Sequence, residues 1–533
     1  MELYSKNNNY KLYYGSMLDM LDVIKSNSID SIVTDPPYEL NFMGKGWDNS
    51  GIAFQSDTWK KCFEVLKPGG YLLAFGGSRT FHRIACAIED AGFEIRDTIM
   101  WLYGSGFPKS MDISKQIDKK GGNDYSKQFA KDLKQARESR NLTMKYCDDK
   151  YCNGSTNWSW YEGRKDGCRV PDYETYLEII KEFPELEKYR ELIKEAEREV
   201  IGKKEYTNDK NVMNISNYNR ERVHLDITIP STELAKQWQG WGTALKPSFE
   251  PIIVARKPFK GSLVDNVIEY GVGGINIDEC RVAFNGDKWK NQKSGSTAKA
   301  FNLNEQQREA GTGVLAGYEC EANENGRFPA NTILTYDETD FDEVCGGFPN
   351  TKSTGGKGEA TANTAMFFGN GNNGKLRANA GGLGDSGSAS RYFYCAKASK
   401  KDRDEGLDEF EEKLYAQSNG SQTAIAKGEE YHKDGIGLNQ TKLRKNTHPT
   451  VKPTELMQYL IRLVSPNGAT ILDPFNGSGS TGKAAMYENR EKNKNYKYIG
   501  IELTKEYLPI AKSRIEYVCN LKEEKEITIF DFI

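Results

Sequence analysis

The sequence predicts an α/β protein built on a doubly wound, mostly parallel sheet, with an inserted helical domain and long loops. Short apolar runs alternate with helical stretches over residues 10–110, and the same alternation returns over 469–502. Between them lie a helical stretch at 125–183 and two segments rich in Gly, Asn, Ser, Thr and Lys. Alternating strands and helices are typical of a parallel sheet covered on both faces.

The first part of the sheet is expected within residues 1–124. Its predicted strands are 11–14, 31–34, 71–75 and 94–103, and its predicted helices are 17–25, 56–66 and 78–91. The strand at 31–34 ends in Asp35-Pro36-Pro37-Tyr38, because prolines cannot continue a hydrogen-bonded ladder. The residue before each proline is held in extended backbone, so this turn is stiff. It lies at the carboxyl end of a strand, where open α/β sheets bind ligands.

This turn suits a flat heterocycle with an exocyclic amine. Asp35 and the carbonyl of Pro36 would accept the two N–H bonds of the amine, and the Tyr38 ring would stack on the heterocycle. Taken alone, the four residues fit a plain rigid turn about as well. The remaining motifs therefore decide between the two interpretations.

Length and composition describe a polar globular protein of several domains. A chain of 533 residues has room for about two to four domains. No apolar run is long enough to span a membrane, and the start has no apolar signal core, so we expect a cytoplasmic protein. Its ten cysteines are expected as reduced thiols. With a net charge of -3, any contact with DNA must rest on local basic patches.

A helical domain is expected at 125–200. Residues 129–140 read as an amphipathic helix, Thr143 can cap the next helix, and two further helices follow at 155–164 and 172–183. The arrangement resembles the helix-turn-helix domain of the phage-repressor type, with a plain helical insertion as the alternative. In a DNA reader, the candidates for groove contacts are Ser155, Thr156, Asn157 and Ser159.

Three cysteines of this region, Cys147, Cys152 and Cys168, raise the question of zinc. A fourth ligand is missing nearby, since the nearest histidine is the distant His224. Buried thiols are therefore favoured, and no metal site is predicted.

The middle of the chain returns to α/β texture at 201–285, with a strand at 251–256. The region 286–446 contains long loops with little apolar periodicity, which are either functional or irrelevant insertions. We expect target recognition in 286–446, with the helical insert as the other candidate.

The final segment, 447–533, restores the sheet. Its strands are predicted at 469–473 and 496–502, joined through a glycine-rich turn and a helix at 483–488. Such a turn lets a ligand approach the backbone closely, and an acid at the end of the second strand, Glu502, suits a ribose diol. The turn also matches the phosphate-binding pattern GxxxxGK, but Ala484 stands where a hydroxyl should hold magnesium. Asp473 would repel a triphosphate and attract an ammonium, so a cationic ribose-bearing ligand fits better than ATP.

Four motifs in order resemble the β-class DNA amino-methyltransferases of the N4/N6 DNA methylase family: DPPY (35–38), LKPGG (66–70), HPTVKP (448–453) and DPFNGSGSTG (473–482). The chain is more narrowly similar to phage and prophage adenine-specific methylases through the stretches 41–48, 72–83, 241–252, 326–331 and 388–403. The resemblance implies a seven-stranded Rossmann-like methyltransferase sheet. Its catalytic half would lie in 1–124 and its cofactor-binding half in 447–533.

The resemblance also implies a role for each motif in S-adenosyl-L-methionine-dependent methylation of DNA. Asp35 and Pro36 would hold the amine of a base flipped out of the duplex, Tyr38 would stack on that base, and the methyl group would pass in line, directly to nitrogen. The cofactor would be held by Asp473, Phe475, Gly477, Gly479, Ser480, Thr481 and Glu502, with His448, Thr450 and Lys452 near its methionine carboxylate. The family usually carries Gly-Asp after the first strand. Here Ser16 follows Gly15, a weaker acceptor for the cofactor's adenine, and Asp19 is a substitute.

The cysteines narrow the choice of target atom in DNA. None of the ten follows a proline, as the motif for carbon-5 cytosine methylation requires, so that class is excluded. Adenine N6 and cytosine N4 are chemically alike, and the first Asp of the motif favours adenine by resemblance. An N4-cytosine enzyme and a non-enzymatic DNA-binding regulator on a methylase scaffold remain the alternatives, with RNA as a weaker third substrate. The recognition site, a partner nuclease for restriction–modification and the oligomeric state, a homodimer included, stay open.

Overall fold

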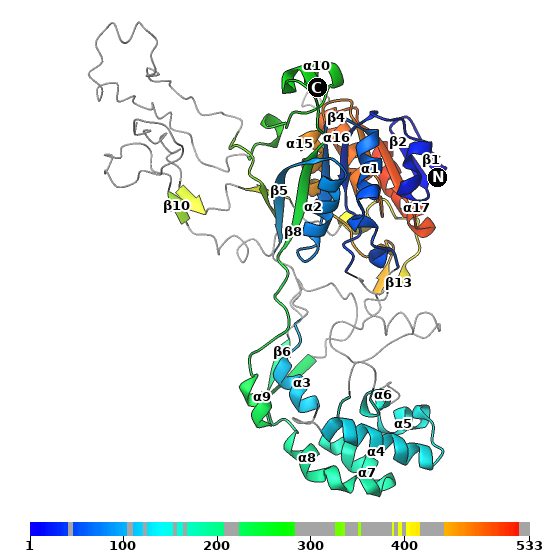
Figure 1. Cartoon of the computed structure of the whole chain (residues 1–533), viewed down its shortest axis with the longest axis vertical. Helices are drawn as coiled ribbons and strands as arrows, with labels where there is room; N and C mark the ends of the chain where they lie inside the picture. The colour runs from blue at the N-terminus through cyan, green and yellow to red at the C-terminus, as the bar shows by residue number, and fades with distance from the viewer. Residues whose placement is uncertain are drawn as a thin grey trace, which may run out of the picture. The chain divides into compact units, whose positions relative to one another are not determined.

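The computed structural model divides the chain into two compact units, one made of Met1–Ser105 and Ser248–Ile533 and the other of Gly106–Pro247 (Figure 1). The structure describes residues 1–40, 46–103, 110–120, 125–152, 157–163, 168–206, 223–282, 326–335, 350–352, 386–388, 393–396, 401–415 and 442–521. Within these ranges, no helix combines the length and the apolar character needed to cross a membrane. The loops predicted at 286–325 lie outside the described residues, as do nearly all of those at 351–390.

The first unit is organised around a sheet whose described part has ten strands, in the order β1-β2-β16-β15-β3-β4-β8-β5-β9-β12. The strands are β1 (Glu2–Lys6), β2 (Tyr10–Tyr14), β3 (Ile29–Thr34), β4 (Leu66–Phe75), β5 (Glu94–Tyr103), β8 (Phe249–Arg256), β9 (Thr332–Thr335), β12 (Tyr394–Cys395), β15 (Thr470–Asp473) and β16 (Lys497–Glu502). All pairs from β2 to β4 are parallel, whereas β8 runs antiparallel to both of its neighbours. The predicted fold class is confirmed. Seven strands run from β2 to β5, and β1, β9 and β12 extend the two edges.

Helices cover both faces of this sheet (Figure 1). One face packs on η1 (Met17–Asp22), α1 (Ser56–Val65) and α2 (Phe81–Asp90), and the other on α15 (Thr454–Val464), α16 (Ser480–Lys492) and α17 (Leu508–Asn520). In β4, Leu72 and Ala74 face the first set, and Leu73 and Phe75 face the second. Successive strand residues point to opposite faces, so a strand that is apolar throughout is one that is buried on both sides.

The smaller elements of the first unit connect these layers. They are η3 (Gly46–Asn49), η4 (Ile52–Phe54), α10 (Leu263–Tyr270), η6 (Asp278–Cys280), α13 (Lys401–Asp404), η9 (Lys505–Tyr507) and the strand pairs β10 (Asn350–Lys352) with β11 (Ser386–Ser388) and β13 (Lys413–Tyr415) with β14 (Lys442–Arg444). The helix predicted at 17–25 is the shorter 3-10 helix η1, in which Asp19 leaves helical backbone angles. The helix predicted from Lys483 begins earlier, at Ser480.

The second unit contains the predicted insert 125–200. Six helical elements, α4 (Tyr125–Ser139), α5 (Met144–Tyr151), α6 (Trp158–Tyr161), α7 (Tyr173–Glu182), η5 (Pro184–Tyr189) and α8 (Arg190–Glu195), share one apolar core. Thr143 caps α5 as predicted, because its hydroxyl accepts from the Tyr146 amide at 3.1 Å. The unit also contains α3 (Ile113–Lys119), α9 (Glu233–Gln237) and the hairpin of β6 (Val200–Tyr206) and β7 (Val223–Thr228). Buried Asp118 of α3 pairs with Arg198 at 2.7 Å and joins these pieces.

Candidate active site

The two motifs that follow β3 and β15 meet at one edge of the sheet. The strands pair in parallel, with Leu472 opposite Ile32, so both chains leave the sheet at the same end. The Thr34 hydroxyl donates to Oδ1 of Asp473 at 2.6 Å, which ties the strand before the DPPY turn to the glycine-rich turn. The structure therefore brings together the two groups of residues that the sequence predicted for amine and cofactor.

Asp35 has one bonded and one open carboxylate oxygen. Lys452 Nζ donates to Oδ2 at 2.8 Å, whereas no described residue donates to the buried Oδ1. Burial raises the pKa of Asp35, and the nearby charge of Lys452 opposes that rise. A buried acceptor without a partner costs free energy. Oδ1 is therefore suited to receive an N–H group from a ligand.

Aromatic rings enclose the ammonium of Lys452. Nζ lies 5.3 Å from the ring centroid of Tyr38, 4.9 Å from that of Phe75 and 5.8 Å from that of Trp101. The Tyr38 hydroxyl donates to Oε2 of Glu250 at 2.7 Å, and the same oxygen lies 3.3 Å from Lys452 Nζ. Aromatic rings and two carboxylates thus surround this ammonium, and such groups suit a planar ligand that carries N–H donors.

The structure places Lys452 beside the DPPY turn. The resemblance implies that Lys452 lies near the methionine carboxylate of the cofactor, and in the structure its ammonium contacts Asp35. His448, four residues earlier, contacts the glycine-rich turn at Gly477 instead. The HPTVKP segment thus runs from the glycine-rich turn to the DPPY turn.

Glycine is required at two positions of the turn after β15. Gly477 and Gly479 have φ angles of 52° and 75°, a region that side chains rarely adopt. A Cβ on Gly477 would lie 2.8 Å from Nε2 of His448, and one on Gly479 would lie 3.0 Å from Ala511. Burial lowers the pKa of His448 to about 3, so its ring is neutral, and Nδ1 lies 2.7 Å from the carbonyl oxygen of Thr450. Neutral His448 and its Thr450 contact support the turn from one side.

The two acids predicted to bind the cofactor differ in how many hydrogen bonds their carboxylates already accept from the protein. Asp473 is 2% exposed and accepts from Thr34, from the Phe475 amide at 3.1 Å and from the Thr481 hydroxyl at 2.7 Å, so it holds the turn together. Burial raises the pKa of Asp473 to about 6.

Glu502 keeps room for a ligand. Its carboxylate accepts from the amides of Gly477 and Thr504, each at 2.7 Å, and burial raises its pKa to about 7. A carboxylate offers about four lone-pair sites, of which these two bonds use two. Since Glu502 ends the strand that follows the glycine-rich turn, its chemistry and its place fit the ribose hydroxyls of S-adenosyl-L-methionine.

The other predicted cofactor residues lie around this turn. Ser16 caps η1, since its hydroxyl accepts from the Leu18 amide at 3.3 Å, and the neighbouring Gly15 amide donates to the Glu502 carbonyl at 3.0 Å. Ser480 and Thr481 begin α16 and are buried, whereas Phe475 is half-buried. Ser16 is thus near the end of β16, with its hydroxyl engaged in the cap.

Two buried cations behind the turn were given no role by the sequence. Arg514 is fully buried and donates to the carbonyl and the hydroxyl of Ser478 at 2.6 and 2.8 Å. Lys483, which the GxxxxGK pattern would place on a phosphate, is buried and lies 2.7 Å from Oε2 of Glu405. Arg514 therefore supports the turn at Ser478, and Lys483 pairs with Glu405.

The residues that sequence reasoning missed are Glu250, Phe75 and Trp101. Glu250 and Phe75 lie in the stretches 241–252 and 72–83, which carried a family likeness without an assigned role. That likeness was the available signal. Their convergence on Lys452 depends on strands β4, β5 and β8 lying side by side, which single-sequence periodicity does not reveal.

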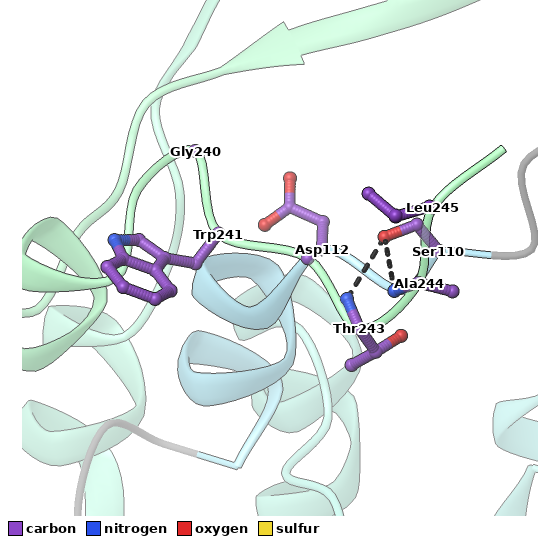
Figure 2. Close-up of a pocket in the computed structure, with 8 residues that line it drawn as sticks. Ser110, Asp112, Gly240, Trp241, Thr243, Ala244 and Leu245 are labelled. Atoms are coloured by element: carbon purple, nitrogen blue, oxygen red, sulfur yellow. Dashed lines mark hydrogen bonds between the residues drawn. The ribbon is translucent and has the colours of Figure 1, made fainter. Parts of the chain in front are cut away.

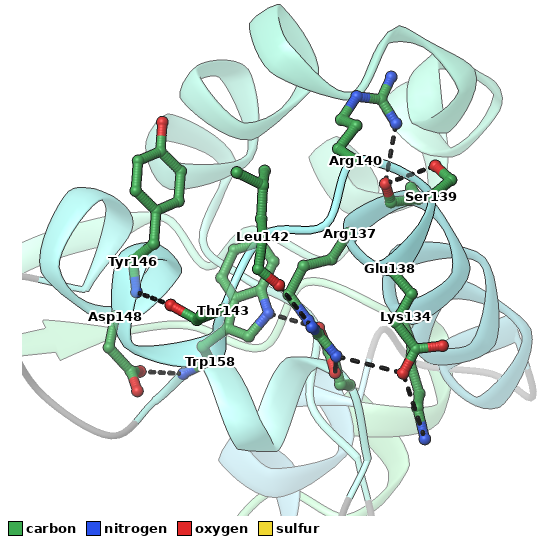
Figure 3. A network of polar contacts seen from close by, with 12 residues as sticks. Lys134, Arg137, Glu138, Ser139, Arg140, Leu142, Thr143, Tyr146, Asp148 and Trp158 are labelled. Atoms are coloured by element: carbon green, nitrogen blue, oxygen red, sulfur yellow. Dashed lines mark hydrogen bonds and ion pairs between the residues drawn. The ribbon is translucent and has the colours of Figure 1, made fainter.

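The predicted DNA-contact residues fall on a short helix of the second unit. Asn157 is exposed just before α6 and Ser159 is half-buried within it, while Ser155 and Thr156 lie outside the described residues. A polar network fixes this segment (Figure 3). Trp158 donates through its amide to Asp148 at 2.9 Å and through its indole nitrogen to Glu162 at 2.6 Å, and Glu162 pairs with buried Arg137.

A recess in the second unit lies apart from these groups (Figure 2). It measures about 720 Å³ and is lined by Ser110, Asp112, Gly240, Trp241, Gly242, Thr243, Ala244 and Leu245. Ser110 Oγ accepts from the Thr243 and Ala244 amides at 3.0 and 3.4 Å, and Asp112 caps α3. These contacts join two chain segments and leave the recess without an evident chemical role.

Metal ligation finds no support in the described part of the chain, where no three His, Cys, Asp or Glu side chains gather as a site would need. Cys147, Cys152 and Cys168 are buried within the second unit, and Cys168 donates to the Ser126 hydroxyl at 3.3 Å.

Comparison with known proteins identifies relatives of the chain. The DNA methylase family matches residues 29–513. The type II methyltransferase M.HpaI of Haemophilus parainfluenzae is 31% identical over 117 residues, 20% of this chain and 36% of that protein. The DNA adenine methyltransferase YhdJ of Escherichia coli K12 is 36% identical over 78 residues, 15% of this chain and 24% of that protein. The chain thus spans only about a third and about a quarter of these two relatives.

Among solved structures, the PvuII DNA methyltransferase, described as cytosine-N4-specific, aligns with 98% of this chain and 92% of its own at 10% identity. Its TM-score is 0.33, so this likeness adds nothing to the argument.

Proposed function

Because this chain belongs to the DNA methylase family, we propose that it transfers a methyl group from S-adenosyl-L-methionine to the exocyclic N6 amine of adenine in DNA. The observation that carries the proposal is the open Oδ1 of Asp35 beside the glycine-rich turn after β15. An acceptor for the amine and a turn for the methyl donor lie at the same edge of the sheet. In-line transfer requires both to be there.

The chain's own residues position the amine. Oδ1 of Asp35 accepts one N–H and the carbonyl of Pro36 accepts the other, which turns the nitrogen lone pair towards the glycine-rich turn. Tyr38 stacks on the heterocycle. When bound, S-adenosyl-L-methionine would supply a sulfonium methyl group for this lone pair, with the carbon–sulfur bonding pair returning to sulfur. The nitrogen then loses one proton, and Asp35 is its first acceptor on the way to solvent.

We propose that the base leaves the duplex to reach Asp35, because the Asp35 side chain is 22% exposed and its Oδ1 is buried. Extruding a base costs a few kcal/mol, and stacking on Tyr38 offsets part of it. Phosphate and groove contacts are assigned in this proposal to the second unit, through Asn157, Ser159 and their neighbours, and to region 286–446.

The choice of adenine over cytosine rests on the resemblance of the DPPY motif. No contact around Lys452 is used to distinguish the two bases. The testing experiment therefore has to read the base directly. Purified protein is incubated with S-adenosyl-L-methionine and unmethylated genomic DNA, and the digested nucleosides are analysed by mass spectrometry. N6-methyladenine is the expected product. N4-methylcytosine would keep the mechanism and replace the base, and no methylated nucleoside on DNA or RNA would favour a DNA-binding regulator.

A further inference from the structure

One ammonium contacts two carboxylates beside the DPPY turn. Lys452 Nζ lies 2.8 Å from Asp35 Oδ2, 3.3 Å from Glu250 Oε2 and 3.2 Å from the Tyr38 hydroxyl. The side chains of Lys452, Asp35 and Glu250 are 8%, 22% and 21% exposed. These groups come from the turn after β3, from β8 and from the segment before α15, so three distant parts of the chain meet at one atom.

The bond to Lys452 decides which oxygen of Asp35 remains open. Lys452 holds Oδ2, and Oδ1 has no partner among the described residues. Glu250 in turn holds the ammonium and the Tyr38 ring through a single oxygen, Oε2. The orientation of the acceptor and of the stacking ring therefore depends on the same pair.

The charges around Asp35 act in opposite directions. Burial raises the pKa of Asp35, the positive charge of Lys452 lowers it, and the negative charge of Glu250 raises it. The other titratable groups that face it are Tyr38, which lies in the same network, and Asp473, whose own pKa Asp35 raises. An ionised carboxylate is the stronger acceptor for an amine N–H. Lys452 thus favours the working form and Glu250 disfavours it.

We propose that Lys452 and Glu250 are positioning residues for methyl transfer: Lys452 keeps Asp35 ionised with Oδ1 open, and Glu250 holds Lys452 and Tyr38 in place. This inference rests on the proposed function. It also changes the role of Lys452 from a cofactor ligand to a group that acts on the acceptor side. The rival is that the ammonium occupies the place of the target amine and must leave before the base enters.

The test compares pH profiles of kcat/KM for unmethylated genomic DNA at saturating tritiated S-adenosyl-L-methionine. This constant reports the groups of the enzyme with its cofactor before DNA binds. In Lys452→Met the acidic limb moves to higher pH by about one unit or more, since an opposite charge at this distance is removed. In Glu250→Gln it moves to lower pH. Lys452→Arg, which keeps the charge, retains the wild-type limb.

Opposite shifts in the two variants are not expected from a general loss of packing. Limbs that stay in place in both variants, or that move in the same direction, overturn the proposal. A Lys452→Met protein that is faster than wild type at every pH supports the rival instead. If Lys452→Met does not fold, Glu250→Gln alone decides through the direction of its shift.

A second measurement does not use activity. Calorimetry of the three variants in the absence of substrate should show that Lys452→Met loses more thermal stability at pH 8 than at pH 5.5. Asp35 then lacks its counter-charge, and protonation of its carboxylate relieves this at the lower pH. An equal loss at both pH values contradicts the pairing. A wild-type protein that methylates nothing rejects the proposed function, while this measurement still tests the pair.

Discussion

Three acids of the site differ in how many of their acceptor positions the protein itself uses. Asp473 receives three bonds, Glu502 receives two amide bonds, and Oδ1 of Asp35 has no donor among the described residues. The open positions mark where ligand atoms belong, because buried acceptors without partners are unfavourable. In the proposed function, Asp473 therefore shapes the glycine-rich turn, Glu502 receives ribose hydroxyls and Asp35 receives the target amine.

Replacing the acceptor should separate chemistry from cofactor binding. We expect Asp35→Asn to lower kcat by about 100-fold or more, since an amide accepts an N–H more weakly than a carboxylate aimed at the developing charge. Affinity for S-adenosyl-L-methionine, measured by calorimetry, should stay within about twofold of wild type, because Glu502 and the turn are untouched. Parallel loss of both would mean that Asp35 holds the cofactor and that its role here is wrong.

The affinity for S-adenosyl-L-methionine should depend on pH through Glu502. Burial raises the pKa of this carboxyl to about 7, so it is partly protonated near neutrality. Ribose hydroxyls donate to the ionised form, so binding favours loss of the proton and affinity rises with pH. Between pH 6 and pH 8 the gain should be about tenfold, as expected for one proton coupled to binding. Titration calorimetry at both values checks this.

Glu502→Gln is the matched variant for that measurement. It keeps the shape of the side chain and removes the titration, so its affinity should be weaker at pH 8 and nearly the same at both pH values. If Glu502→Gln keeps the full tenfold change in affinity between pH 6 and pH 8, another group causes the pH dependence. That result would contradict the role given to Glu502.

Residues could be predicted where the chemistry is local. Neighbouring residues in the sequence are enough to predict the DPPY turn, the glycines of 473–482 and Glu502. The structure brings these residues to one edge of the sheet. The Tyr38–Glu250 bond joins positions 212 apart and the Lys452–Asp35 bond positions 417 apart. Such pairs depend on strand order, so a motif can suggest that Lys452 matters without showing which partner it meets.

At the scale of elements, the second unit is held by a polar core as well as an apolar one. Arg137 of α4 pairs with Glu162 after α6, with side chains 10% and 2% exposed, and Glu162 also accepts from the Trp158 indole. A second Arg137 nitrogen donates to the Leu142 carbonyl at 2.7 Å. The pair thus links α4, the connection to α5 and α6, the elements that a helix-turn-helix reader would need to hold in register.

Removing one partner of this pair should loosen the helices and leave the sheet intact. We expect Arg137→Met to cost about 3–5 kcal/mol of local stability, because it leaves Glu162 buried without its counter-charge. Hydrogen–deuterium exchange of the full chain should show faster exchange in α4, α5 and α6, with β3 and β4 unchanged. Arg190→Met, whose partner Glu187 is exposed, is the control and should change little. Unchanged protection in Arg137→Met would contradict the role of the pair.

The strands and helices themselves followed well from periodicity, and the exceptions have physical reasons. β5 has the predicted bounds, 94–103. The helix predicted at 17–25 became η1 because Ser16 caps it at the first turn and Asp19 breaks the helical geometry. Caps and single backbone angles are decided by local hydrogen bonds, which a hydrophobic pattern does not record.

At the scale of the whole molecule, the second unit is an insertion into a hairpin. β5 and β8 are antiparallel neighbours, with Leu102 opposite Phe249, and the Tyr103 amide donates to the Ser248 carbonyl at 2.9 Å. The chain therefore leaves the sheet after Tyr103 and returns at Ser248, directly opposite. A sheet that closes on itself at this point does not need the inserted unit for its own hydrogen bonds.

We therefore expect the first unit to survive excision of residues 104–247. Joining Tyr103 to Ser248 through Asn-Gly makes a two-residue hairpin loop, which the twist of antiparallel strands favours. The shortened protein should unfold cooperatively in calorimetry and bind S-adenosyl-L-methionine within about twofold of the full chain, since Glu502 and the turn remain. Its affinity for DNA, or the set of sites that it methylates in genomic DNA, should change. A protein that does not fold would show that the sheet depends on the inserted unit. Unchanged affinity and unchanged sites would remove the second unit from DNA recognition and leave that role to region 286–446.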